Sequence, residues 1–126
     1  MDPEPYYKEL RKVSPAPYAA FLDFDAFQIC SSSMERFLKI TKDHIETKPI
    51  KGTLPRGKNE EEDRENIGLL KENPQYFAKN VMIVDLLRNH LGKICKVNSV
   101  QVPKYLSVET FSTLHQLVST VVGKRK

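Results

Sequence analysis

The segment from Asn73 to Gly92 constrains the fold most, because it carries a start signal, a stop signal and an apolar face. Asn73-Pro74 is typical of a helix start, where an Asn side chain caps the first turn and proline takes the first helical position. Gly92 is a residue type that ends helices, and Arg88 and His90 suit the negative end of the helix dipole. Apolar residues recur at steps of three or four, with a second apolar strip beside them. We therefore predict a helix at the centre of the core.

Residues 16–46 show a longer apolar pattern with helical spacing. Its members would share one face of a helix, and they are Ala20, Phe24, Phe27, Cys30, Met34, Phe37, Thr41 and Ile45. Ser32 and Glu35 fit a capping box, so a second helix could begin there. The pattern thus leaves one long helix and a kinked pair equally open.

The segments that flank these two complete the predicted fold. Residues 1–15 form an N-terminal arm with room for one or two helical turns. Residues 47–66 are predicted to be a flexible charged loop, because Pro and Gly punctuate them and charged residues dominate their second half. A short helix follows through Ile67, Leu69 and Leu70.

The C-terminal part is predicted to end in one more helix, from residue 104 or 107 to residue 122, followed by a basic tail at residues 124–126. Strand content is confined to about residues 94–102, which alternate weakly. The expected fold class is all-α, an irregular bundle of four or five helices. A chain of 126 residues suits a single domain, residues 1–126.

One short motif resembles a phosphate-binding loop, at Gly52–Asn59. It satisfies G-x-x-x-x-G-K but has Asn59 where a Ser or Thr would hold magnesium. Such a loop also needs a buried strand before it and a helix N-terminus that faces the phosphates. Here the four acidic residues from Glu60 to Asp63 follow and would repel a nucleotide. The sequence therefore favours a surface loop.

No other motif indicates chemistry. The three histidines, His44, His90 and His115, stand on separate segments, and no H-x-x-x-H, H-E-x-x-H or C-x-x-C pattern occurs. Asp23 and Asp25 are two residues apart and would point to different sides of a helix. We predict no catalytic residue, no cofactor and no metal.

Positive charge gathers in the second half of the chain. The net charge is +4, and residues 74–126 carry eight Lys and Arg against Asp85 and Glu109. An anionic partner would meet this half. The residues expected to contact an anion or nucleic acid are Lys93, Lys96, Lys104, Lys124, Arg125 and Lys126.

The functional prediction is a non-enzymatic interaction module, an adaptor or subunit of a complex, because an extended apolar stripe accompanies no catalytic pattern. The residues expected to bind a protein partner, or a second copy in a homodimer, are Phe21, Phe24, Phe27, Met34 and Phe37. One alternative is a nucleic-acid-associated protein that uses the basic half, and another is an enzyme whose site assembles only in three dimensions. No apolar run approaches the roughly 20 residues of a membrane span. Two isolated cysteines favour an intracellular location, in the cytoplasm or nucleus.

Overall fold

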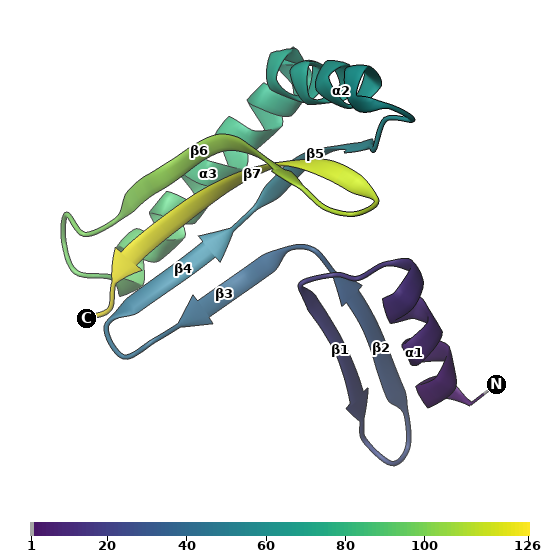
Figure 1. The fold of residues 1–126 in the computed structure, drawn as a ribbon. Coiled ribbons are helices and arrows are strands. Elements are labelled where there is room, and N and C mark those ends of the chain that lie inside the picture. Colours follow the sequence, from purple (N-terminus) through teal and green to yellow (C-terminus); the bar gives the residue numbers. More distant parts are fainter. Residues whose placement is uncertain (1) are drawn as a thin grey trace. The chain divides into compact units, whose positions relative to one another are not determined.

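The computed structural model describes residues 2–126, and its contacts group into two compact units. The first ends at Arg36 and the second begins at Phe37. The first unit contains one helix and two strands, which are α1 (Pro3–Val13), β1 (Tyr18–Asp23) and β2 (Gln28–Ser33) (Figure 1). The prediction of a single domain over residues 1–126 stays a prediction.

The first unit is a β-hairpin with a helix packed on it. Strands β1 and β2 pair antiparallel from Tyr18↔Ser33 to Asp23↔Gln28. The carboxylate of Asp23 holds the turn, because its Oδ1 accepts hydrogen bonds from the backbone N–H of Asp25 and from the side chain of Gln28, both at 3.1 Å. Asp25 has φ of +60°, a conformation that Asp tolerates well in turns.

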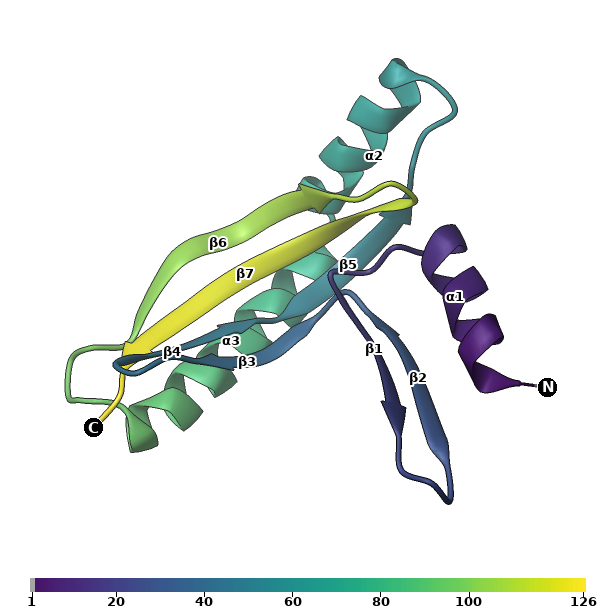
Figure 2. The same ribbon diagram turned by 60° about the horizontal axis from the view of Figure 1, so that its bottom comes forward.

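The second unit is an antiparallel sheet with two helices. Its elements are β3 (Arg36–Ile40), β4 (His44–Lys48), β5 (Ile50–Pro55), α2 (Glu60–Glu72), α3 (Pro74–Ile94), β6 (Gln101–Thr110) and β7 (Leu114–Lys124). Strand β7 is central: β4 and β5 pair in succession along one of its edges, and β6 pairs with the other. Figure 2 shows β6 arched along β7.

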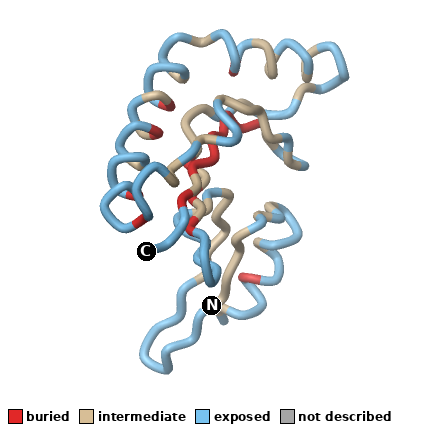
Figure 3. Tube along the Cα trace, turned by 90° about the vertical axis from the view of Figure 1, so that its left-hand side faces the viewer, coloured by how far each residue is buried: buried red, intermediate tan, exposed pale blue. Residues whose placement is uncertain are grey.

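Both helices of the second unit lie on one face of β7. Val121 packs there with Val84 and Leu91 of α3, and Ile45 and Cys95 complete this core. Figure 3 shows buried positions gathered along the sheet and at intervals along α3. Side chains alternate along a strand, so Gln116, Val118, Thr120 and Val122 lie on the opposite face. We call this opposite face the helix-free face.

A bulge at Gly52 sets which residues of β5 reach the helix-free face. Ile50 pairs with Val118 and Thr53 pairs with Gln116. Between these two pairs β5 advances by three residues and β7 by two, which is a β-bulge. Gly52 has φ of +123°, a backbone conformation that residues with a side chain rarely adopt. A Cβ on Gly52 would lie 3.1 Å from Tyr76 Cγ. The bulge therefore returns Thr53 to the face of its partner on β7.

The predicted all-α bundle is wrong, because the described chain contains seven strands and three helices. Residues 16–46 form strands β1 to β3 and the start of β4. The predicted C-terminal helix is instead the β6–β7 hairpin. The predicted loop at residues 47–66 holds β5 and the first half of α2.

The helix predicted from Asn73 to Gly92 is confirmed as α3, which runs two residues further. The Asn73 side chain caps it by accepting from the backbone N–H groups of Gln75 and Tyr76. The short helix predicted through Ile67 to Leu70 is part of the longer α2. None of the helices described over residues 2–126 is both long and apolar enough to span a membrane.

Candidate functional site

Three polar residues form a row across the helix-free face. Gln116 on β7 pairs with Thr53 on β5 and with Glu109 on β6. Residues that are paired across antiparallel strands point to the same face, with Cβ atoms about 5 Å apart. The side chains of Thr53, Gln116 and Glu109 therefore lie side by side, and we call them the site row.

Gln116 is the least satisfied member of the site row. The residue is 7% exposed, and its Oε1 is buried with no hydrogen-bond partner among residues 2–126. Leaving a buried amide oxygen unpaired costs about 1–3 kcal/mol. Such a group in a folded protein points to a donor that binds there, either from a ligand or from further polypeptide.

An ion pair borders the site row. Lys48 of β4 donates from Nζ to Oε1 of Glu109, at 2.5 Å, and both side chains are partly buried, at 22% and 29% exposed. Strands β4 and β6 flank β7 on opposite sides, so this pair crosses over β7 on the helix-free face. Val118, only 2% exposed, lies on the same face between the two flanking strands.

The site row and its ion pair offer complementary binding groups. The Gln116 amide can accept one hydrogen bond and donate others, the Thr53 hydroxyl can do both, and the Lys48 ammonium supplies a positive charge. This set fits a small anion that also carries a hydroxyl group. No cluster of acidic, His or Cys side chains suited to hold a metal ion occurs in the described part of the chain.

The helix-side face directly behind the site row holds a second polar cluster. His115 is fully buried; its Nε2 lies 2.9 Å from Oδ1 of Asp63, and its Nδ1 lies 2.8 Å from the Thr110 hydroxyl. Asp63 also accepts from the Arg56 guanidinium and from the backbone N–H of Gly57, at 2.6 Å.

The donors around Asp63 fix its charge. The Arg56 guanidinium, followed by the Gly57 N–H and His115, holds the pKa of the Asp63 carboxyl well below its usual range. Asp63 is therefore ionised at neutral pH and accepts every one of these hydrogen bonds.

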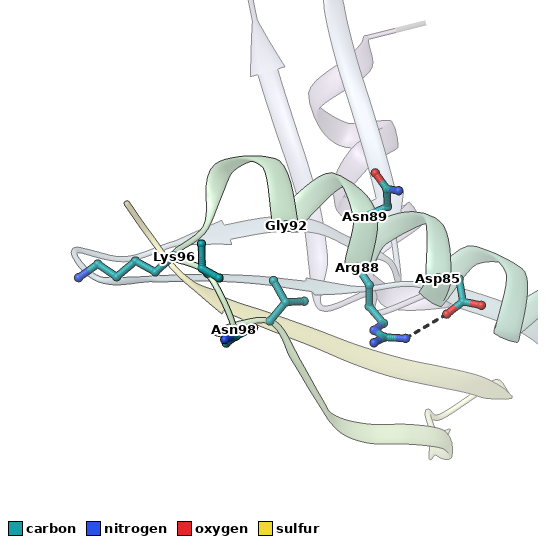
Figure 4. Close-up of a pocket in the computed structure, with 8 residues that line it drawn as sticks. Asp85, Arg88, Asn89, Gly92, Lys96 and Asn98 are labelled. Atoms are coloured by element: carbon teal, nitrogen blue, oxygen red, sulfur yellow. Dashed lines mark hydrogen bonds and ion pairs between the residues drawn. The ribbon is translucent and has the colours of Figure 1, made fainter.

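A hollow beside α3 lies elsewhere and has a weaker claim to function. It encloses about 490 Å³ beside the turn that leads from α3 to β6. Figure 4 shows that Arg88 is joined to Asp85 while the Lys96 side chain extends away from both. The charged groups around this hollow do not converge on one point.

The residues predicted to bind a partner do not form one stripe. Phe21 packs its ring on Tyr7 of α1, with ring centroids 5.5 Å apart. Phe24 and Phe27 stack on each other in the exposed β1–β2 turn. Met34 is half-buried between β2 and β3, and Phe37 at the start of β3 is 81% exposed. Partner binding or self-association through these residues stays a prediction.

Five of the six predicted cationic residues come together at one end of the second unit. The backbone N–H of Lys96 donates to the carbonyl of Lys124, and Lys126 Nζ donates to the carbonyl of Lys93. Arg125 forms an isolated bridge with Cys95. Lys104 lies apart, on β6, where it pairs with Thr120. Contact of these residues with an anion stays a prediction.

Sequence reasoning missed the site row entirely. Its members come from β5, β6 and β7, so no linear motif contains them. Thr53 lies inside the segment that resembled a phosphate loop, and there Gly52 serves as a bulge residue. The neighbouring pair His115-Gln116 was the available signal, because two polar residues inside an apolar strand need partners on both faces.

Comparison with known proteins identifies relatives across the whole chain. The family model described as chorismate binding enzyme matches residues 1–126. The aminodeoxychorismate synthase of Streptomyces pristinaespiralis is 50% identical over 125 residues, which are 98% of this chain and 17% of the relative. The anthranilate synthase component 1 of Aquifex aeolicus is 38% identical, over 98% of this chain and 25% of the relative.

A solved structure supports the same relationship. Anthranilate synthase component I from Streptococcus pneumoniae superimposes with a TM-score of 0.85 at 34% identity, covering 99% of this chain and 27% of that one. The chain thus spans less than a third of the length of these relatives.

These matches overturn the predicted interaction module and its nucleic-acid alternative, because the relatives are enzymes. The prediction that the chain is not enzymatic is wrong for the same reason. A site assembled only in three dimensions escapes any search for linear motifs, which explains the error. The chain belongs to the family of chorismate-binding enzymes.

Proposed function

We propose that this chain supplies one wall of the chorismate site in an enzyme of the aminodeoxychorismate synthase type, and that the helix-free face is this wall. The relatives at 50% and 49% identity are named aminodeoxychorismate synthases, from Streptomyces pristinaespiralis and Arabidopsis thaliana. Chorismate is an anion with two carboxylates and a hydroxyl group. The ammonium, amide and hydroxyl groups of the helix-free face suit such a ligand.

The observation that carries this proposal is the buried, unpaired Oε1 of Gln116. A hydroxyl group of the bound ligand would donate to it and remove the cost of an unsatisfied acceptor. Thr53 stands next to it on β5 and provides a second hydrogen-bonding group on the same face.

The Lys48 ammonium supplies the positive charge of the proposed site, and the Glu109 carboxylate balances that charge in the chain without ligand. A ligand carboxylate that approaches Lys48 gains a charge-assisted hydrogen bond, worth about 1.5–3 kcal/mol when it is partly buried. Glu109 holds the ammonium in place at 2.5 Å before the ligand arrives. Because Lys48 belongs to β4 and Glu109 to β6, the ion pair itself connects the two strands that flank β7.

The complete reaction needs groups beyond this wall. The relatives are three to seven times longer than the matched segment, which covers 14% to 30% of them. We therefore assign chorismate binding to these residues and leave the amino-transfer chemistry to the enzyme as a whole.

Anthranilate synthase is the second candidate, because relatives with that name are 38% and 39% identical over nearly the whole chain. The two activities differ in their product from chorismate. Mass spectrometry of the products formed from chorismate and an amino-group donor distinguishes aminodeoxychorismate from anthranilate.

The test of the proposed site is a calorimetric titration with chorismate. Gln116→Leu removes the amide and keeps the approximate volume, so we expect the affinity to fall at least roughly tenfold. Gln75→Leu makes the same change at an exposed position near the start of α3 and serves as the control. Equal affinity of the Gln116 and Gln75 variants would rule the site out.

We also propose an intracellular location. Both cysteines of the chain, Cys30 and Cys95, are unpaired thiols. Thiols persist in the reducing interior of cells.

A further inference from the structure

His115 is buried and stands at the centre of a hydrogen-bonded relay, which extends to the exposed Thr110. Both of its ring nitrogens are engaged, with Asp63 at 2.9 Å and with Thr110 at 2.8 Å, and the side chain has no exposed area. Because the ionised Asp63 can only accept, the hydrogen lies on Nε2 of His115. In the neutral ring, Nδ1 is then an acceptor and the Thr110 hydroxyl donates to it.

The relay joins three segments that are far apart in the sequence. His115 belongs to β7, Thr110 ends β6, and Asp63 lies in the first turns of α2. Asp63 in turn binds Arg56 and Gly57, which follow β5. The end of β5, the end of β6 and the start of β7 are thus connected through the imidazole ring of His115.

This relay lies directly behind the site row. On the helix side, His115 pairs with Leu54 of β5 and Thr110 of β6. The next residue of β7 is Gln116, and its partners are Thr53 on β5 and Glu109 on β6. Gln116, Thr53 and Glu109 are therefore the chain neighbours of His115, Leu54 and Thr110. The site row and the row that the relay holds lie on opposite faces of the same three strands.

We propose that His115 is a positioning residue for the chorismate site: through Asp63 and Thr110 it fixes the backbone that aims Gln116 at the ligand. This inference rests on the proposed function above. His115 itself points away from the helix-free face and makes no contact with the ligand. A one-residue slip of β7 would exchange the two rows, so anchoring this register has a direct effect on binding.

Thr110 offers a matched pair of variants. Thr110→Val removes the hydroxyl that meets His115 Nδ1 and keeps the side-chain shape, whereas Thr110→Ser keeps the hydroxyl. We expect the Val variant to bind chorismate roughly threefold to tenfold more weakly, which corresponds to one lost hydrogen bond. The Ser variant should bind like the unmodified chain. Equal affinity of the two variants, at temperatures where both are folded, would overturn the proposal.

A second readout follows Gln116 without any ligand. The NMR resonances of the Gln116 side-chain amide should shift in Thr110→Val and stay in place in Thr110→Ser. Asp63→Asn acts on the other ring nitrogen and should shift them as well, which covers the case of a Val variant that does not fold. Unchanged Gln116 resonances in the folded variants would refute the positioning role.

The two readouts separate this proposal from the proposed function. If the unmodified chain does not bind chorismate, the proposed function fails. The amide resonances of Gln116 would still decide whether the relay positions that side chain.

Discussion

Ser119 provides the sharpest test of how the sheet and α3 are held together. Its buried hydroxyl donates to Oδ1 of Asn80 at 2.6 Å and accepts from the backbone N–H of Leu106 at 3.1 Å. Asn80, also without exposed area, donates in turn to the carbonyl of Leu117. The hydroxyl therefore links α3, β7 and the bulged part of β6.

Ser119→Ala removes both contacts and leaves two polar groups without these partners. Each unpaired buried group costs about 1–3 kcal/mol, and Leu106 is only half-buried, so we expect the free energy of unfolding to fall by about 2–4 kcal/mol. Urea unfolding followed by circular dichroism measures it. With a slope of about 2 kcal/mol per molar, in the middle of the range for small proteins, the midpoint should fall by about 1–2 M with the slope unchanged.

Asn89→Ala is the control, because Asn89 lies exposed on the same helix, and its effect should stay within about 0.5 kcal/mol. The double variant Asn80→Ala with Ser119→Ala should lose less than the sum of the two single variants, since it removes a donor together with its acceptor. A loss below about 0.5 kcal/mol in Ser119→Ala would show that the linkage does not stabilise the fold.

Three further predictions concern single side chains. The Arg56 guanidinium, with Gly57 and His115, lowers the pKa of Asp63 in the folded chain, so the stability from this carboxylate is complete above its unfolded value of about 4 and is lost as the pH falls further. The urea midpoint of the unmodified chain should therefore exceed that of Asp63→Asn by less at pH 3 than at pH 5, which are about one unit either side of that value. A difference in midpoint that stays constant over this range would contradict the prediction. Gly123→Ala would place a Cβ 2.5 Å from Cys95 Sγ and should cost about 1–3 kcal/mol, and adding Cys95→Ala should recover part of that loss in thermal unfolding. Gly52→Ala would put a Cβ on a residue with φ of +123° and at 3.1 Å from the Tyr76 ring. The variant should therefore be less stable and bind chorismate more weakly. An unchanged affinity in the folded variant would show that the bulge does not place Thr53.

The helix α3 could be predicted because its signals are local. The Asn73 cap, Pro74 and the apolar spacing lie within one segment, and the structure places the cap as predicted. Even there, Gly92 does not end the helix, which continues to Ile94.

The strand β7 was mistaken for a helix because it is buried on both faces. Its apolar residues Leu114, Leu117 and Val121 recur at steps of three and four, and this spacing alone does not distinguish a buried strand from a helix. Its β-branched residues, Val118, Thr120, Val121 and Val122, were the signal in favour of a strand.

The β1–β2 hairpin was also hidden by spacing. Phe24 and Phe27 are three residues apart, as on a helix, but they stand in a turn that Asp23 holds with its side chain. Asp residues compete with helix in this way through local hydrogen bonds. The geometry of the site row could not be predicted from the sequence, since it depends on the pairing of β7 with two strands and on the bulge at Gly52, although the polar pair His115-Gln116 was a signal for one of its members.

The most direct test of the central claim is an NMR titration of the isotope-labelled chain with chorismate. The helix-free face should respond: the resonances of Thr53, Gln116 and Glu109 should shift first, together with those of Lys48. Residues around the α3 hollow, Asp85 and Arg88, should stay in place. Shifts confined to that hollow, or no shift at saturating chorismate, would contradict the assignment of the helix-free face as the chorismate site.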